Sequence, residues 1–135
     1  MQFKYNDGGR AAAGYKGQAN DCVVRAVAIA TERDYREVYR ELSRHMKSCG
    51  YRASARDGIP NWVVREYLKE LGFKWVKTMG KGTGIQVHLK EGELPKGTLI
   101  ASLSRHVAAV IDGTIHDTHN PSRGGTRGVY GYWVK

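Results

Sequence analysis

The stretch NDCVVRAVAIAT, residues 20–31, decides the fold. Nearly every position from Cys22 to Thr31 is apolar, and Arg25 is its one basic residue. A helix that is apolar on all sides is covered by the rest of the protein instead of lying on the surface. The stretch therefore predicts a central buried helix that begins at Cys22.

Two more helices are expected after this one. Asp34, followed three residues later by Glu37, resembles a capping box, and apolar residues then recur at helical spacing. A third helix is expected to begin near Pro60, a residue that favours the first helical turn, and to end at Gly72. The pattern thus predicts a helical part over residues 22–72.

The period of the pattern changes after the third helix, where short β-branched, aromatic and apolar runs alternate with turn residues. The runs that predict strands are 73–78, 98–102, 107–111, 114–118 and 129–134. We interpret residues 73–135 as a mainly β part built as an antiparallel meander. Residues 1–21, rich in glycine, alanine and asparagine, predict an irregular N-terminal arm. Helices followed by strands predict one α+β domain over residues 1–135.

The composition indicates a globular protein without a membrane span. Of 135 residues, 41% are hydrophobic and 26% are charged, and no apolar run is long enough to cross a bilayer. The first residues carry no secretory leader pattern, and the two cysteines are too few for a disulfide framework. We therefore expect a cytoplasmic protein with free thiols.

The net charge of +9 invites a nucleic-acid partner, because basic surfaces attract phosphate. Lysines and arginines are, however, scattered between Lys4 and Lys135 and interleaved with acids on the expected helices. This distribution favours a solvated basic surface over a nucleic-acid face or a face for an acidic partner.

Cys22 stands where a cysteine can serve as a nucleophile. Only the thiolate reacts, and both a helix N-terminus and a nearby histidine lower the pKa of a thiol. The backbone N–H of Cys22 would also face the charge that develops on a substrate carbonyl. A buried helix that opens on cysteine therefore suits acyl transfer.

A hairpin places a histidine and an acid on one face of the sheet. Asp112-Gly113 is a strong two-residue turn, so Ile111 pairs with Thr114 in the expected register. Because directly opposed residues share a face and strand side chains alternate, His106 and Asp117 lie on the same face within side-chain reach. Asp117 is therefore the expected group that orients the imidazole.

Other polar residues near this hairpin have weaker roles. Asn120 is the alternative orienter of the imidazole, and His119 is a neighbour of the site or a structural residue. His116 and His119, three apart on a strand, point to opposite sides and cannot chelate an ion without a bend, so no metal or cofactor is expected. Arg123 and Arg127 in the following loop either bind an acidic group of a substrate or are solvated.

Three segments together resemble the papain-like cysteine peptidase superfamily, especially its small bacterial and bacteriophage members. They are residues 20–26 (NDCVVRA), residues 104–113 (SRHVAAVIDG) and residues 116–117 (HD). The resemblance implies an N-terminal helical lobe that carries the cysteine helix, packed on a C-terminal antiparallel sheet, with the site in the cleft between them.

The same resemblance implies a role for each residue of the site. Cys22 corresponds to the nucleophile, His106 to the general base and then acid, and Asp117 to the orienter. Gln18 corresponds to an oxyanion-hole glutamine, although it lies four residues before Cys22 where these enzymes commonly have about six. The function expected is hydrolysis of an amide or isopeptide bond in a peptide or protein, or transfer of the acyl group to an amine. The alternative is a non-catalytic interaction protein on the same fold.

Overall fold

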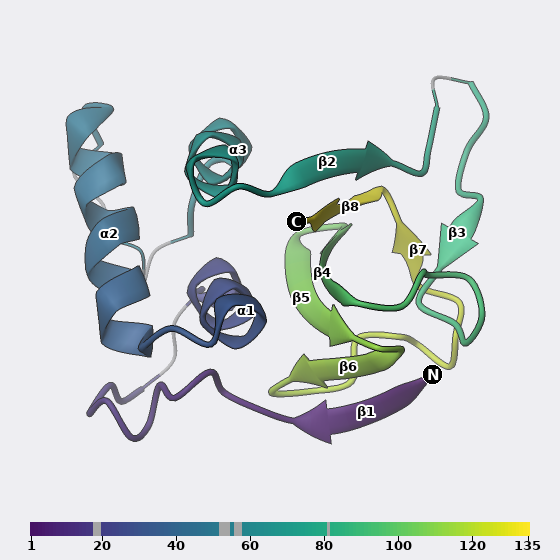
Figure 1. Cartoon of the computed structure of the whole chain (residues 1–135), viewed down its shortest axis with the longest axis horizontal. Coiled ribbons are helices and arrows are strands. Elements are labelled where there is room, and N and C mark those ends of the chain that lie inside the picture. Colours follow the sequence, from purple (N-terminus) through teal and green to yellow (C-terminus); the bar gives the residue numbers. More distant parts are fainter. Residues whose placement is uncertain (18–19, 52–54, 56–57, 81) are drawn as a thin grey trace.

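The computed structural model describes residues 1–17, 20–51, 55, 58–80 and 82–135. In this part of the chain, three helices and eight strands form an α+β architecture (Figure 1). The helices are α1 (Cys22–Thr31), α2 (Tyr35–Ser48) and α3 (Asn61–Glu70). The strands are β1 (Gln2–Tyr5), β2 (Lys74–Lys77), β3 (Val87–His88), β4 (Thr98–Leu103), β5 (His106–Ile111), β6 (Thr114–Asp117), β7 (Gly128–Val129) and β8 (Gly131–Val134).

The expected helices are confirmed, with some differences at their ends. The Asp34 side chain caps α2 by accepting from the backbone N–H of Arg36 at 2.7 Å. Glu37 does not complete a capping box with Asp34; its carboxylate pairs with Arg33 at 2.6 Å. Pro60 is the N-cap of α3 and precedes the first helical residue.

The main sheet is mixed, which corrects the expected antiparallel meander. Among the described residues its strand order is β1-β6-β5-β4-β8-β2, and only β4, β5 and β6 follow one another as a meander. The prediction of an irregular arm is wrong for residues 2–5. They form β1, which pairs in parallel with β6. Phe3 and Tyr5 alternate with polar residues, but four residues are too few to predict a strand without the open edge of β6.

Each face of the sheet contributes to a separate core. On β4, Ile100 packs with the helices, whereas Leu99 and Ala101 pack in a second core with Leu89 and Val129. This alternation follows from the two-residue period of a strand. Both faces of the central strands are therefore covered, by helices on one side and by the region of β3 and β7 on the other.

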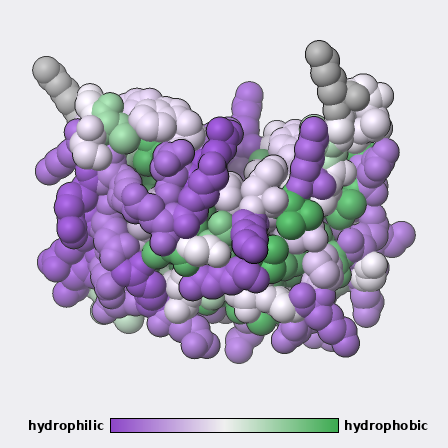
Figure 2. Space-filling view, turned by 45° about the horizontal axis from the view of Figure 1, so that its top comes forward, coloured by the Kyte–Doolittle hydropathy of each residue, from purple (hydrophilic) through white to green (hydrophobic). Residues whose placement is uncertain are grey.

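The surface fits the dispersed charge of the sequence. On the face drawn in Figure 2, hydrophilic residues predominate and apolar residues show as smaller areas between them. None of the helices in the described part of the chain has the length and apolarity needed to span a bilayer.

Candidate active site

Cys22 is the first residue of α1 and is partly exposed. The residue before it, Asp21, is the N-cap of α1, but its carboxylate makes no capping hydrogen bond to the helix. The positive end of the helix dipole therefore acts at Cys22 without a capping carboxylate in the first turn.

The hairpin that carries the histidine and the acid has the expected register. Ile111 pairs with Thr114 and Val110 with Ile115, and Asp112 and Gly113 both have positive φ, at 48° and 81°. Two positive φ values define the type I′ turn that joins strands most tightly. His106 then begins β5 and Asp117 ends β6, so both lie at the end of the hairpin opposite its turn.

His106 and Asp117 are in direct contact. His106 Nε2 donates to Asp117 Oδ2 at 2.6 Å, and the backbone N–H of Thr118 donates to Asp117 Oδ1 at 2.7 Å. Asp117 is only 3% exposed, so the carboxylate has a fixed orientation in a site that excludes most water. The hydrogen bond to Asp117 therefore fixes the orientation of the His106 ring, as a carboxylate does for a histidine that serves as a general base.

Cys22 completes the constellation. Its thiol lies near the imidazole of His106 and the backbone of Val107, close enough for both to lower the thiol pKa. Since Nε2 of His106 is bound to Asp117, Nδ1 is the ring nitrogen left for Cys22. The structure thus brings together the three side chains that the sequence singled out, Cys22, His106 and Asp117.

The three groups favour an ion pair. Burial alone would raise the pKa of Cys22, but hydrogen bonds to His106 and Val107 and the nearby positive charges lower it overall. Burial would lower the pKa of His106, yet its bonds to Asp117 and Cys22 raise it to about 9. Burial would raise the pKa of Asp117, but the bond to His106 leads the effects that lower it. At neutral pH these directions favour thiolate, imidazolium and carboxylate.

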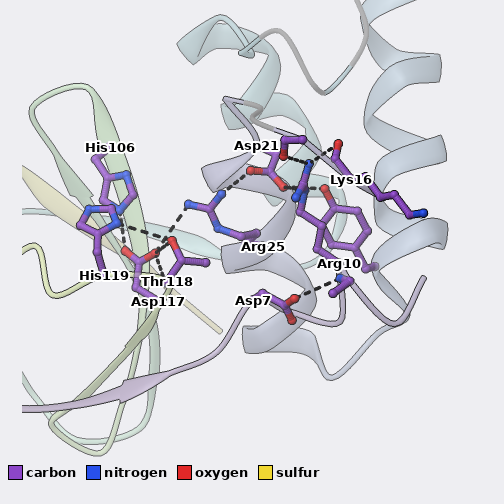
Figure 3. A network of polar contacts seen from close by, with 12 residues as sticks. Asp7, Arg10, Lys16, Asp21, Arg25, His106, Asp117, Thr118 and His119 are labelled. Atoms are coloured by element: carbon purple, nitrogen blue, oxygen red, sulfur yellow. Dashed lines mark hydrogen bonds and ion pairs between the residues drawn. The ribbon is translucent and has the colours of Figure 1, made fainter. Parts of the chain in front are cut away.

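Arg25 is a site residue that the sequence did not identify as functional. It lies one helical turn after Cys22, and its guanidinium lies between Asp21 and Asp117 (Figure 3). Arg25 Nη1 pairs with Asp21, and Nη2 lies 3.6 Å from Asp117 Oδ1. The signal was present, because Arg25 is the single charged residue within α1. A largely buried charge requires partners, and here they are Asp21 and the acid that contacts His106, Asp117.

Asp21 anchors the N-terminal segment to the same network. Only 1% exposed, it accepts from Tyr35 Oη at 2.5 Å and pairs with Arg10 Nε at 3.2 Å. Arg10 also donates to the carbonyls of Lys16 and Gly17, at 3.1 and 2.7 Å. The chain before α1 is therefore tied down by specific polar contacts next to the site.

Cys22 and His106 open into a broad groove of about 1770 Å³. Its described lining also includes Trp75 on β2, Ser102 on β4 and Tyr130 between β7 and β8. The partly exposed thiol is therefore open to solvent through this groove.

The other residues that the sequence predicted for the site do not contact Cys22, His106 or Asp117 in the described part of the chain. Gln18 lies outside the described residues. Asn120 is exposed and accepts from the backbone N–H of Ser122 at 3.0 Å, so Asp117 alone of the two expected orienters contacts the imidazole. Arg123 and Arg127 are not in the groove lining of the described chain. Arg127 instead donates to the Ser104 carbonyl at 2.6 Å, in the turn before His106.

Among the described residues, one group of side chains has the chemistry to hold a metal ion. Ligand atoms of His106, Asp117 and His119 lie within 4.8 Å of one another, and the two imidazole rings are 5.1 Å apart. His116, which forms the HxxH spacing with His119, is not in this group. A cation here would take the place of the proton between His106 and Asp117, so metal binding and the triad are alternatives.

No family model, curated protein or solved structure matches this chain in the comparisons made.

Proposed function

We propose that this protein is a papain-like cysteine hydrolase that cleaves an amide or isopeptide bond through a thioester on Cys22. The observation that carries the proposal is the contact chain from the Cys22 thiol to His106 and on to Asp117 at 2.6 Å. The resemblance to small bacterial and bacteriophage papain-like proteins supports it, and so does the position of the thiol at a helix N-terminus.

In the first half of the proposed reaction, the Cys22 thiolate attacks the carbonyl carbon of the scissile bond. The carbonyl π electrons move onto oxygen, and in this proposal the backbone N–H of Cys22 stabilises that oxyanion. As the oxyanion collapses, His106 Nδ1 gives its proton to the leaving nitrogen and the C–N bond breaks. The acyl group remains on sulfur as a thioester, and the amine departs neutral.

In the second half, His106 is neutral and acts as a base. Its Nδ1 takes a proton from water, the hydroxide oxygen attacks the thioester carbon, and the C–S bond breaks. This releases the acid and restores the thiolate and imidazolium. An amine in place of water would complete a transfer reaction with the same three residues. Asp117 stays ionised and holds Nε2–H throughout.

The test is alkylation of the protein by iodoacetamide at pH 6.5, followed by peptide mapping of Cys22 and the exposed Cys49. An ordinary thiol is about 1% ionised at this pH, whereas an ion-paired thiolate is almost fully ionised, an advantage of up to about 100-fold. A thiolate of low pKa is intrinsically less nucleophilic, which reduces the advantage to about tenfold. We expect Cys22 to react faster than Cys49 by that factor.

His106→Ala should remove most of the advantage, because the imidazolium partner is lost. His88→Ala is the matched control, since His88 lies on β3 and pairs with Glu93 outside the groove lining. Equal rates at the two cysteines in wild type, or a fast Cys22 in His106→Ala, would contradict the proposal.

A further inference from the structure

The groove that opens onto the thiol contains positive charge that no described acid balances. Four arginines line it, Arg10, Arg25, Arg65 and Arg105. The first two are bound to the buried carboxylate of Asp21, and Asp7, the other acid of the described lining, accepts from backbone N–H groups. Arg65 and Arg105 are exposed and make no ion pair within the described part of the chain. The groove therefore presents two guanidinium groups that a ligand with negative charge can approach.

Arg105 stands at a turn position that does not favour arginine. Ser104 and Arg105 are the two residues that join β4 to β5, since Leu103 pairs with His106. The φ of Arg105 is 57°, in the left-handed region, and the second residue of a turn with this φ is usually glycine or asparagine. A long cationic side chain held in this conformation beside a groove points to a role in binding.

The turn is held from outside the groove. Arg127 Nη2 donates to the Ser104 carbonyl at 2.6 Å, and Arg127 itself is not in the described lining of the groove. Arg105 is in that lining, directly before His106. The backbone of the turn thus has its own contacts, and the Arg105 side chain faces the groove without being needed to close the turn.

The place of Arg105 next to His106 decides which part of a substrate it meets. In the proposed reaction His106 gives its proton to the leaving nitrogen, so the leaving amine lies on the His106 side of the scissile bond. The Cα atoms of neighbouring residues lie about 3.8 Å apart across a trans peptide, and no described peptide bond is cis. A peptide that continues beyond the leaving nitrogen therefore brings its first or second residue within reach of the Arg105 guanidinium.

From these observations we propose that Arg105 is a specificity-determining residue that binds the carboxylate of an aspartate or glutamate on the leaving-amine side of the scissile bond. The acid is the first or second residue after that bond. A guanidinium donates two parallel hydrogen bonds to a carboxylate, and the carboxylate supplies the counter-ion that Arg105 lacks in the described chain. The inference rests on the proposed function for the orientation of the substrate. It names acidic peptides as the substrate class of this basic protein.

The test uses the transfer reaction, in which an amine takes the place of the leaving group. p-Nitrophenyl acetate acetylates Cys22 with loss of p-nitrophenolate, and an equimolar mixture of Glu-Ala amide and Gln-Ala amide then competes for the acetyl thioester. The amine nitrogen bonds to the thioester carbon, the C–S bond breaks, and His106 takes the amine proton. Ala-Glu amide and Ala-Gln amide test the second position in the same way.

Mass spectrometry measures the ratio of the two acetylated peptides. The products formed with Cys22→Ala are subtracted as background, and their ratio corrects for the intrinsic reactivity of the two amines. We expect wild type to favour the glutamate peptide by about fivefold at one of the two positions, the upper range for an ion pair open to solvent. The preference should shrink in about 0.5 M NaCl, because salt screens such a pair.

Arg105→Gln should bring the corrected ratio close to one, and Arg105→Glu should invert it. Arg123→Gln is the matched control, because it removes the same charge from an exposed residue outside the described groove lining, and it should keep the wild-type ratio. A ratio near one at both positions in wild type, or an equal fall in Arg123→Gln, would overturn the subsite.

Arg105→Gly separates binding from folding. Glycine adopts positive φ without steric cost, so the turn should form in this variant and thermal melts should show a folded protein. The corrected ratio should nevertheless fall to about one. A glutamate preference that survives in folded Arg105→Gly would show that another cation meets the carboxylate, and would overturn the proposal.

A binding measurement separates this inference from the proposed function. Both glutamate peptides and their glutamine counterparts are titrated into Cys22→Ala and into Cys22→Ala with Arg105→Gln, and binding is followed by NMR. Binding that needs both the glutamate and Arg105 supports the subsite even where Cys22 proves unreactive with iodoacetamide, which defeats the hydrolase proposal alone. A reactive, His106-dependent Cys22 without such binding leaves the function standing and overturns the subsite.

Discussion

Replacement of Arg25 by methionine tests whether the network around the triad stabilises the fold. The change keeps an unbranched, flexible stem and removes the guanidinium and its charge. In the wild type, the guanidinium is 12% exposed and lies between two carboxylates that are 1% and 3% exposed, those of Asp21 and Asp117. In Arg25→Met both acids lose a cationic partner in a site with little water.

The size of the stability loss depends on which partners each of the two acids keeps in Arg25→Met. Removing one partner of a buried pair costs about 3–5 kcal/mol. Asp21 keeps Arg10 and Tyr35, and Asp117 keeps His106 and Thr118, which places Arg25→Met at the lower end, about 3 kcal/mol. With an unfolding entropy of about 2.1 cal/mol/K per residue, this loss lowers the Tm of a 135-residue chain by about 10 °C.

The pH dependence identifies the mechanism. Burial alone would raise the pKa of Asp117. The hydrogen bond to His106 outweighs that effect, the Arg25 charge adds to it, and the pKa is lowered overall. A lowered carboxyl pKa contributes stability above the unfolded value of about 3.9, and this is lost as pH falls through the folded pKa. The stability difference between wild type and Arg25→Met should therefore be largest above about pH 5 and shrink in acid.

The assay is urea unfolding followed by circular dichroism between pH 3 and pH 7. Arg40→Met is the control, because Arg40 is exposed on α2, and it should stay within about 0.5 kcal/mol of wild type. A loss below about 1 kcal/mol in Arg25→Met, or a loss that is the same at pH 3 and pH 7, would refute this reasoning.

Two further outcomes are expected. Asp117→Asn should lower the pKa of His106 from about 9, because the carboxylate is the first of the partners that raise it against burial; an NMR titration of the His106 ring measures it, and an unchanged midpoint would contradict the pairing. EDTA should leave the alkylation rate of Cys22 unchanged, because the proposed reaction needs only side chains. A rate that falls in EDTA and returns with Zn²⁺ would instead favour a metal at His106, Asp117 and His119.

Local patterns in the sequence predict much of the framework. The apolar run after Cys22 implies a buried helix because Arg25 and Thr31 are its only polar side chains and it has no polar face to turn toward water. The Asp112-Gly113 turn implies the pairing of β5 and β6, because a two-residue turn sets the register of its own strands. From that register follows the contact of His106 with Asp117, a long-range feature that one local turn determines.

Only the tertiary structure decides the contacts between segments that no turn links. The parallel pairing of β1 with β6 uses an edge that exists once the hairpin has formed. Arg25 meets Asp117 because α1 packs on the sheet, and the Trp75 ring covers Gly131 because β2 and β8 become neighbours. Helical period and strand alternation act over a few residues, so the sequence alone determined which residues form the helix that begins at Cys22 and the hairpin that carries His106. Their meeting, and the aromatic groove beside them, depend on how distant segments pack, which no local period encodes.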